Sequence, residues 1–254
     1  MTRSPKTAEN APDSDRSGDR IRLGDILKGI GEALPEALKV QRGLWNLVTS
    51  KPTSIGSIGL RLQELADATP HATALKFDER RWTYAEFNAW ANRVAAACRT
   101  AGVKRGQVVA ILQSNRPETL AAIAGVVKLG ATAAMLNHNQ RGAVLAHSLR
   151  LSKPVMLIVG EECAEAIASL TGSDDALTGV ATKAWDGGNA PEGWQDWASA
   201  CDRETSGNPP ETASIQLKEA CFHIFTSGTT GLPKASVMSH YRWMKGMAGL
   251  GQMT

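Results

Sequence analysis

Short apolar runs alternate with segments of helical periodicity from about Leu60 onward. Four apolar runs predict β-strands, namely Thr73–Phe77, Val108–Leu112, Thr132–Leu136 and Pro154–Val159. Apolar residues at helical spacing predict helices, namely a short one from Leu60 that ends before Pro70, and then Asn115–Leu129, Gly142–Leu151 and Glu161–Leu170. Strands that alternate with helices in this way predict right-handed βαβ crossovers, and therefore an α/β fold with a mostly parallel sheet and flanking helices.

Local signals mark several of these boundaries. Residues Asp78–Arg80 are typical of a turn after the first strand. Thr83 and Glu86 have the spacing of a capping box, which predicts a helix that starts there and runs to Gly102. Gly130 predicts the end of the helix that begins at Asn115.

The segment from residue 171 to residue 220 is less regular. Trp194 and Trp197 lie three positions apart, which predicts a helix on which both act as packing residues. Asp202–Thr212 is polar and contains Pro209-Pro210, so we interpret it as a connecting loop.

The first 50 residues have a different character. Residues 1–20 carry almost no large apolar side chains and predict a disordered tail. Residues 21–50 predict an amphipathic helical segment, because apolar residues recur at helical spacing on both sides of Pro35. We favour a helix pair that packs on its own domain. The alternative hypothesis is peripheral membrane contact through residues 21–48, although the net charge there is only +1.

Composition argues against a nucleic-acid-binding, a membrane-spanning or a secreted protein. The chain has 254 residues, of which 28 are Lys or Arg and 25 are Asp or Glu, so its net charge of +3 does not favour a nucleic-acid-binding protein. The 43% of apolar residues is typical of a soluble globular chain. No apolar stretch reaches 18 residues, and the first 20 residues lack the apolar core of a secretory signal.

The pattern of cysteines favours a reducing compartment. The four cysteines are scattered and form no C-x-x-C pair, which argues against a disulfide framework and a zinc site. We therefore expect a cytoplasmic protein, with the inner face of the membrane as its location if residues 21–48 do bind lipid.

One segment concentrates residues that bind anions. It runs from Phe222 to Lys234, and an apolar strand-like run enters it. Its candidate binding residues are Thr226, Ser227, Gly228, Thr229, Thr230, Gly231 and Lys234. A second apolar run, Ala235–Met238, follows, and Ser239 is expected to cap a further helix.

This composition is typical of a polyphosphate site. Glycines let the backbone approach an anion and direct its N–H groups inward, and hydroxyl groups add neutral donors. Each hydrogen bond to a charged group contributes about 1.5–3 kcal/mol. A lysine at 4 Å adds about 4 kcal/mol near a protein surface and only ~1 kcal/mol in bulk water. The loop backbone and hydroxyls are therefore expected to set the geometry, with Lys234 as an electrostatic supplement.

Two other interpretations fit the segment less well. A Walker-type loop counted from Gly228 needs glycine at position 233 and serine or threonine at 235, whereas the sequence has Pro233 and Ala235. A flexible surface turn with an exposed lysine explains any two of these residues but explains the whole string poorly. No G-x-G-x-x-G follows the strand Val108–Leu112, so a dinucleotide-binding fold has no support.

Several titratable residues are candidates for catalytic groups. His138 follows a strand at the edge where α/β sheets bind ligands, but we favour a role in shaping the loop. Cys221 and His223 alternate on one strand and are interpreted as a packed cysteine beside a satisfied histidine. His240 is either close to the nucleotide or acyl site or simply a residue in the first turn of a helix.

The sequence also contains two pairs of adjacent acidic residues. Glu161-Glu162 and Asp174-Asp175 are interpreted as solvated charges. The five histidines have no metal-ligand spacing. The sequence assigns no catalytic residue and no protein metal ligand.

The string TSGTTGLPK resembles the signature loop of the adenylate-forming (AMP-binding) superfamily. Arg81–Phe87 and Val127–Ala131 resemble two earlier blocks of that family, in which Thr83 and Lys128 are expected to be scaffold. Leu136–Arg141, together with Ala235 after the loop lysine, is similar to the branch of long- and very-long-chain fatty acyl-CoA synthetases and fatty-acid transport proteins. The resemblance extends from about Leu60 to the end of the chain.

The resemblance implies a two-step reaction. ATP and a fatty acid give an acyl-adenylate and pyrophosphate, and coenzyme A then displaces AMP to give a thioester. It implies ATP, Mg²⁺ and coenzyme A as cofactors or co-substrates, and Thr226–Lys234 as the loop that holds the β- and γ-phosphates.

The family's loop is followed by a long second half that holds the adenine contacts, the magnesium-binding glutamate, most of the acyl pocket and a mobile C-terminal domain. We therefore expect residues 51–254 to be a partial AMP-binding N-terminal domain, in which Lys234 is not the catalytic lysine of the missing domain. The alternatives are a ligase for another carboxylic acid and a non-catalytic, truncated nucleotide-binding remnant.

Overall fold

The structure, a computed structural model, describes residues 50–226 and 232–250. These residues lie in one compact unit that comprises Thr49–Thr254. The tail expected at residues 1–20 lies outside the described residues, as does the helical segment expected at residues 21–50 apart from Ser50.

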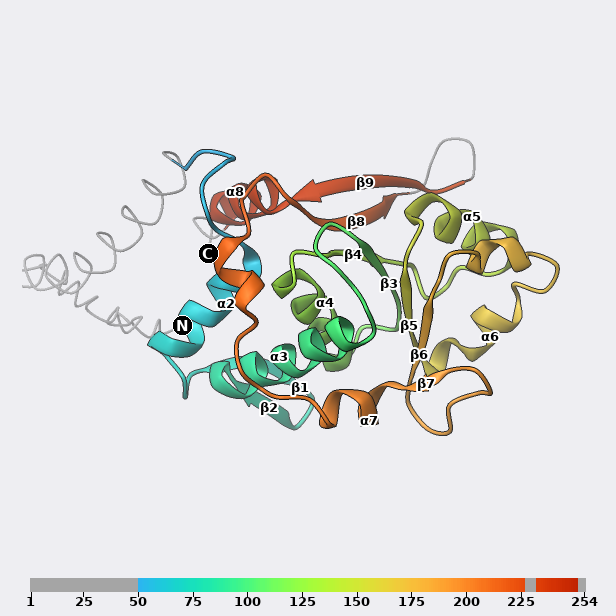
Figure 1. Cartoon of the computed structure of the whole chain (residues 1–254), viewed down its shortest axis with the longest axis horizontal. Helices are drawn as coiled ribbons and strands as arrows, with labels where there is room; N and C mark the ends of the chain where they lie inside the picture. The colour runs from blue at the N-terminus through green and yellow to red at the C-terminus, as the bar shows by residue number, and fades with distance from the viewer. Residues whose placement is uncertain (1–49, 227–231, 251–254) are drawn as a thin grey trace, which may run out of the picture. The chain divides into compact units, whose positions relative to one another are not determined.

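A seven-stranded sheet in the order β7-β6-β5-β3-β4-β8-β9 organises this unit (Figure 1). Its strands are β3 Val108–Leu112, β4 Thr132–Met135, β5 Met156–Gly160, β6 Thr182–Asp186, β7 Gln195–Asp196, β8 Ala220–Thr226 and β9 Lys234–Ser239. All neighbouring strands are parallel except β9, which pairs antiparallel with β8. The predicted α/β fold with a mostly parallel sheet is confirmed.

Helices cover both faces of this sheet. The helices are α2 Ile58–Ala68, α3 Tyr84–Thr100, α4 Pro117–Lys128, α5 Gly142–Ser152, α6 Ala164–Ala168, α7 Trp197–Asp202 and α8 His240–Leu250. Buried residues of α3, α4 and α7 belong to one apolar cluster, and buried residues of α5 and α6 belong to another. The sheet therefore forms the middle layer between two helical layers.

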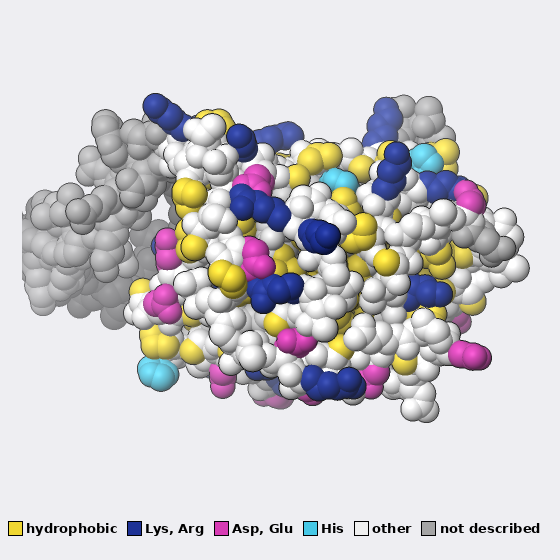
Figure 2. Space-filling view, viewed as in Figure 1, with side chains coloured by type: hydrophobic (Ala, Val, Ile, Leu, Met, Phe, Trp, Pro, Cys, Tyr) yellow, Lys and Arg dark blue, Asp and Glu magenta, His cyan; other side chains and the backbone are white. Residues whose placement is uncertain are grey.

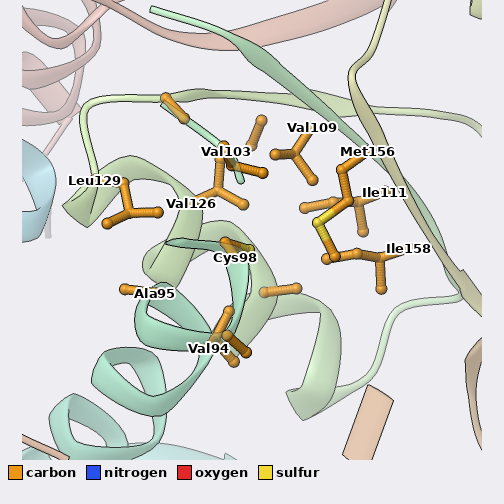
Figure 3. Close-up of a cluster of buried hydrophobic side chains, with 14 of the residues drawn as sticks. Val94, Ala95, Cys98, Val103, Val109, Ile111, Val126, Leu129, Met156 and Ile158 are labelled. Carbon is orange, nitrogen blue, oxygen red and sulfur yellow. The ribbon is translucent and has the colours of Figure 1, made fainter. Parts of the chain in front are cut away.

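The strands explain why both clusters form. Val109 and Ile111 of β3 belong to the cluster with α3 and α4, while Ala110 and Leu112 belong to the cluster with α5. Figure 3 shows Val109, Ile111, Met156 and Ile158 facing side chains of α3 and α4. A strand that is buried on both faces reads as a continuous apolar run, and this pattern made β3 and β5 recognisable in the sequence.

A small antiparallel hairpin precedes α3. It consists of β1 Thr73–Phe77 and β2 Arg80–Thr83, and Asp78 in its turn has a φ of 51°. The backbone N–H of Thr83 donates to Glu86 Oε2 at 2.8 Å, and the N–H of Glu86 donates to Thr83 Oγ1 at 3.2 Å. The predicted capping box is therefore present at the start of α3.

Two expectations about the middle of the chain were wrong. The helix expected over Glu161–Leu170 is a 3₁₀ turn, Glu161–Cys163, followed by the short α6. The segment interpreted as irregular contains β6 and β7, and Trp194 lies before β7 rather than on a helix with Trp197, which begins α7. Trp194 still acts as a packing residue, because its ring meets that of Trp185 edge to face with centroids 5.7 Å apart.

The surface agrees with the balanced composition. On the face shown in Figure 2, Lys and Arg side chains are spread over several elements and form no continuous basic patch. Among the described residues, no helix is long and apolar enough to cross a bilayer.

Candidate functional site

The glycine-rich segment is the connection of a β-hairpin. β8 ends at Thr226 and β9 begins at Lys234, and these two residues are opposite each other in the last pair of the hairpin. Both are exposed. The candidate residues Ser227, Gly228, Thr229, Thr230 and Gly231 lie outside the described residues. The described stem thus places the hydroxyl side chain of Thr226 on one side of the loop and Lys234 on the other.

The hairpin lies where a parallel sheet binds ligands. Thr226 is at the carboxyl end of β8, and β8 runs parallel to β4, so the loop shares an edge of the sheet with the carboxyl ends of β3 and β4. Ligands of open α/β sheets bind at this edge. At the far end of β9, the N–H of Arg242 donates to Ser239 Oγ at 3.3 Å, which confirms Ser239 as a cap of α8.

A cavity of about 590 Å³ lies at the same edge of the sheet. Its apolar walls come from β1, β3, α4 and the end of β4, and they comprise Leu75, Phe77, Ile111, Pro117, Leu120, Ile123, Met135 and Leu136. Its polar lining comprises Gln113, Asn115, Arg116, Thr119, Asn137 and His138. His138 thus lines the cavity from the loop after β4, as its position in the sequence indicated.

A charged network lies next to this cavity. Arg116 Nη2 donates to Asp186 Oδ2 at 2.8 Å, and Gln113 Nε2 donates to the same oxygen at 2.7 Å. Glu162 accepts a hydrogen bond from the N–H of Ser114 at 2.7 Å, and its Oε1 lies 3.5 Å from Arg116 Nε. The network joins the carboxyl ends of β3, β5 and β6.

This network adds to the interpretation of one acidic pair as solvated charges. Glu162 is exposed but also pairs with Arg116. Asp175 of the other pair is an exposed charge, as expected, and its surface partner is Arg150 at 2.6 Å. Burial opposes ionisation of Glu162, but the hydrogen bonds from Ser114 and the charge of Arg116 outweigh it and lower the pKa of Glu162. Burial raises the pKa of Asp186 in spite of Arg116. Sequence reasoning missed Asp186 because it ends a strand with little apolar signal.

His240 lies at the opposite edge of the sheet. It begins α8, its N–H donates to the carbonyl of Glu219 just before β8, and its Nδ1 accepts from the N–H of Ile58 at 3.2 Å. Burial lowers the pKa of His240 to about 4. It is therefore a residue of the first helical turn, as the second alternative described, and it lies at the other end of β9 from Lys234.

Cys221 and His223 on β8 act in packing. Cys221 is fully buried, its Sγ donates to the carbonyl of Met238 at 3.3 Å, and burial raises the pKa of its thiol to about 12. A thiol with that pKa is a poor nucleophile at neutral pH. His223 is half-buried, but its Nδ1 has no hydrogen-bond partner among the described residues, so the expected satisfied histidine was wrong.

Metal ligands are not grouped in the described ranges 50–226 and 232–250. Within them, no set of three or more His, Cys, Asp or Glu side chains is placed to hold a metal ion. The early blocks are scaffold, as expected: Thr83 caps α3, and Lys128 is fully buried with its Nζ 2.6 Å from Asn88 Oδ1.

Comparison with protein families gives a match over most of the chain. The model of the family described as "AMP-binding enzyme" matches residues 62–254. The chain is 38% identical over 233 residues to a medium/long-chain-fatty-acid–CoA ligase, FadD6, of Mycobacterium tuberculosis, covering 92% of this chain and 37% of the relative. It is 37% identical over 174 residues to human long-chain fatty acid transport protein 1, covering 67% of this chain and 26% of the relative.

Solved structures give the same fold. An anthranilate CoA ligase, AuaEII, in complex with anthranoyl-AMP superposes with a TM-score of 0.69 at 25% identity, covering 77% of this chain and 36% of that chain. The N-terminal domain of FACL13 from Mycobacterium tuberculosis superposes with a TM-score of 0.64 at 29% identity, covering 72% and 44%. The chain thus spans about a third of the length of the curated relatives it matches.

Proposed function

Because the chain belongs to the AMP-binding enzyme family, we propose that it supplies the phosphate-binding loop of a long- or very-long-chain fatty acid–CoA ligase. The observation that carries the proposal is the string Thr226–Lys234 on the β8–β9 hairpin, at the ligand-binding edge of the sheet. Similarity to a fatty-acid–CoA ligase and to fatty acid transport proteins supports the fatty acid as substrate.

The proposed reaction has two steps. The carboxylate attacks the α-phosphorus of ATP to give an acyl-adenylate and pyrophosphate, and the thiol of coenzyme A then displaces AMP to form the thioester. In the first step, the loop between Thr226 and Lys234 holds the β- and γ-phosphates as they become pyrophosphate. Donors fixed before the reaction stabilise the charge that collects on this leaving group.

Mg²⁺ would neutralise phosphate charge when bound. The described residues offer it no cluster of carboxylates or histidines, so we assign no Mg²⁺ ligand to them. In this part of the chain, Lys234 in the stem is the proposed source of positive charge for the phosphates.

Equilibrium binding of ATP by the 254-residue chain tests the loop. We expect the double variant Lys234→Ala/Thr229→Ala to bind ATP at least tenfold more weakly, because it loses a charge and a hydroxyl donor that we propose bind the phosphates. Lys104→Ala is the matched control, since Lys104 is an exposed lysine near the amino ends of the strands. Titration calorimetry measures all three proteins, and equal ATP affinity in the double variant would refute the phosphate-binding role.

ATP–pyrophosphate exchange by the protein purified from its own cells tests the acid. We expect exchange to depend on hexadecanoate or tetracosanoate and to be low with anthranilate or acetate. A second candidate function, ligation of an aromatic acid, is favoured by the similarity to an anthranilate CoA ligase. Exchange driven by anthranilate and by neither fatty acid would select that second candidate and reject the fatty-acid assignment.

A further inference from the structure

A histidine outside the glycine-rich segment contacts its carboxyl end. His147 lies on α5, and its Nε2 is 3.1 Å from the carbonyl oxygen of Pro233. A carbonyl oxygen can only accept, so Nε2 carries the hydrogen and donates it. Pro233 is buried and directly precedes Lys234, the first residue of β9. The contact therefore holds the chain at the point where the loop re-enters the sheet.

The helix that presents His147 is firmly held. Leu145, Ala146 and Leu149 of α5 are fully buried in the apolar cluster on one face of the sheet. At the start of α5, the N–H of Gly142 donates to Ser169 Oγ at 2.7 Å. Figure 1 shows α5 beside the loop end of the β8–β9 hairpin, in agreement with the contact between His147 and Pro233.

Polar contacts also join α5 to the segment before it. Ser148 Oγ donates to Gln140 Oε1 at 2.9 Å, and Arg141 Nη1 donates to the carbonyl oxygens of His138 and Gln140 at 2.7 and 2.9 Å. These bonds order the chain that leads from the cavity edge into α5. Because α5 is held in place, His147 cannot move with the hairpin. Its hydrogen bond therefore restrains the hairpin at Pro233.

We propose that His147 is a positioning residue for the phosphate loop, an inference that rests on the proposed function. By holding the Pro233 carbonyl, it fixes the backbone from which the Lys234 side chain extends toward the phosphates. Pro233 and Lys234 then have less conformational freedom to lose when ATP binds. Pre-ordering of this kind strengthens binding without a direct contact to the ligand.

The matched pair His147→Gln and His147→Met isolates the donor. The two replacement side chains have similar length, but only glutamine carries an N–H group. We expect His147→Met to bind ATP about three- to tenfold more weakly than the natural chain, and His147→Gln to recover most of that affinity. His71→Ala, at an exposed histidine before β1, should leave the ATP affinity unchanged.

Limited trypsin digestion tests the tether without nucleotide. Cleavage after Lys234 requires the end of the hairpin to open. We expect this cleavage, identified by peptide mass, to be several-fold faster in His147→Met than in His147→Gln, while cleavage after the exposed Lys76 proceeds at the same rate in both.

The two measurements separate the possible failures. Equal cleavage rates in the Gln and Met variants overturn the tether. Faster cleavage in the Met variant with unchanged ATP affinity overturns the positioning role. Unchanged ATP affinity in Lys234→Ala/Thr229→Ala overturns the proposed function itself, and the positioning role with it, whatever the digestion shows about the Pro233 contact.

Discussion

Lys128 is a charged side chain in a fully buried position at the end of α4. Its Nζ donates to Asn88 Oδ1 at 2.6 Å, and Asn208 Oδ1 is 3.5 Å away. Burial lowers the pKa of Lys128 to about 8, and the charge of Asp67 offsets this only in part. The protonated lysine therefore costs free energy in the folded state at neutral pH.

The sign of the pH dependence follows from this lowered pKa. Between pH 8 and about pH 10.4, the unfolded chain holds the lysine proton and the folded chain does not, so the contribution of Lys128 to the free energy of unfolding rises with pH. Lys128→Met is expected to raise the free energy of unfolding. We expect this increase to be about 2 kcal/mol smaller at pH 10 than at pH 8, as measured by urea unfolding.

Subtracting the free energy of unfolding of the natural chain from that of the variant at each pH cancels the contributions of the other titrating groups. Lys104→Met, which changes an exposed lysine, is the matched control. A pH-independent difference between Lys128→Met and the natural chain would show that Lys128 is not desolvated in the folded chain.

The contact between helices α3 and α4 depends on a glycine. Gly125 of α4 is buried against α3, and a Cβ at this position would lie 2.6 Å from Val94 Cβ and 2.9 Å from the carbonyl oxygen of Ala91. The second of these neighbours is backbone, so relief requires the whole helix to shift. The close approach of these two helices therefore depends on the missing side chain.

Gly125→Ala is expected to lower the free energy of unfolding by about 1–3 kcal/mol, since overpacking forces the helices apart. Gly246→Ala in α8 is the matched helical control. Nothing lies within 4 Å of a Cβ at Gly246, so the same substitution should raise stability by up to about 1 kcal/mol. Urea unfolding of both variants measures the difference, and equal effects of the two substitutions would contradict the packing argument.

Elements with strong local signals were predictable from the sequence. β1 and β3 have the predicted boundaries. β3 is a continuous apolar run, and β1 is a mostly apolar run that ends at the predicted turn Asp78–Arg80. β6 was missed because Thr182–Asp186 contains only Ala184 and Trp185 as apolar residues. Its burial comes from pairing with β5 and from the ring of Trp194, neither of which is visible in a local pattern.

At the scale of the whole molecule, the candidate site was predictable only in its local part. The string Thr226–Lys234 indicates phosphate binding because its residue types are contiguous. The partners of Arg116 at Glu162 and Asp186, and the contact of His147 with Pro233, join residues far apart in the sequence. Such pairs depend on the order of the strands in the sheet. A single sequence does not predict that order, so it does not predict which of these residues meet.

The strand order also determines when the site can be completed. β4 pairs with β3, which directly precedes it, and with β8, so that Ala133 faces Phe222. Closing the second pair costs about 1 kcal/mol more in chain entropy than closing the first, because a longer stretch of chain must be looped out. A ribosome delivers the chain from its amino end, so the edge of β4 has no partner until the glycine-rich hairpin has emerged. The hairpin that carries the proposed phosphate loop is thus also the element that seals this edge against strands of other nascent chains.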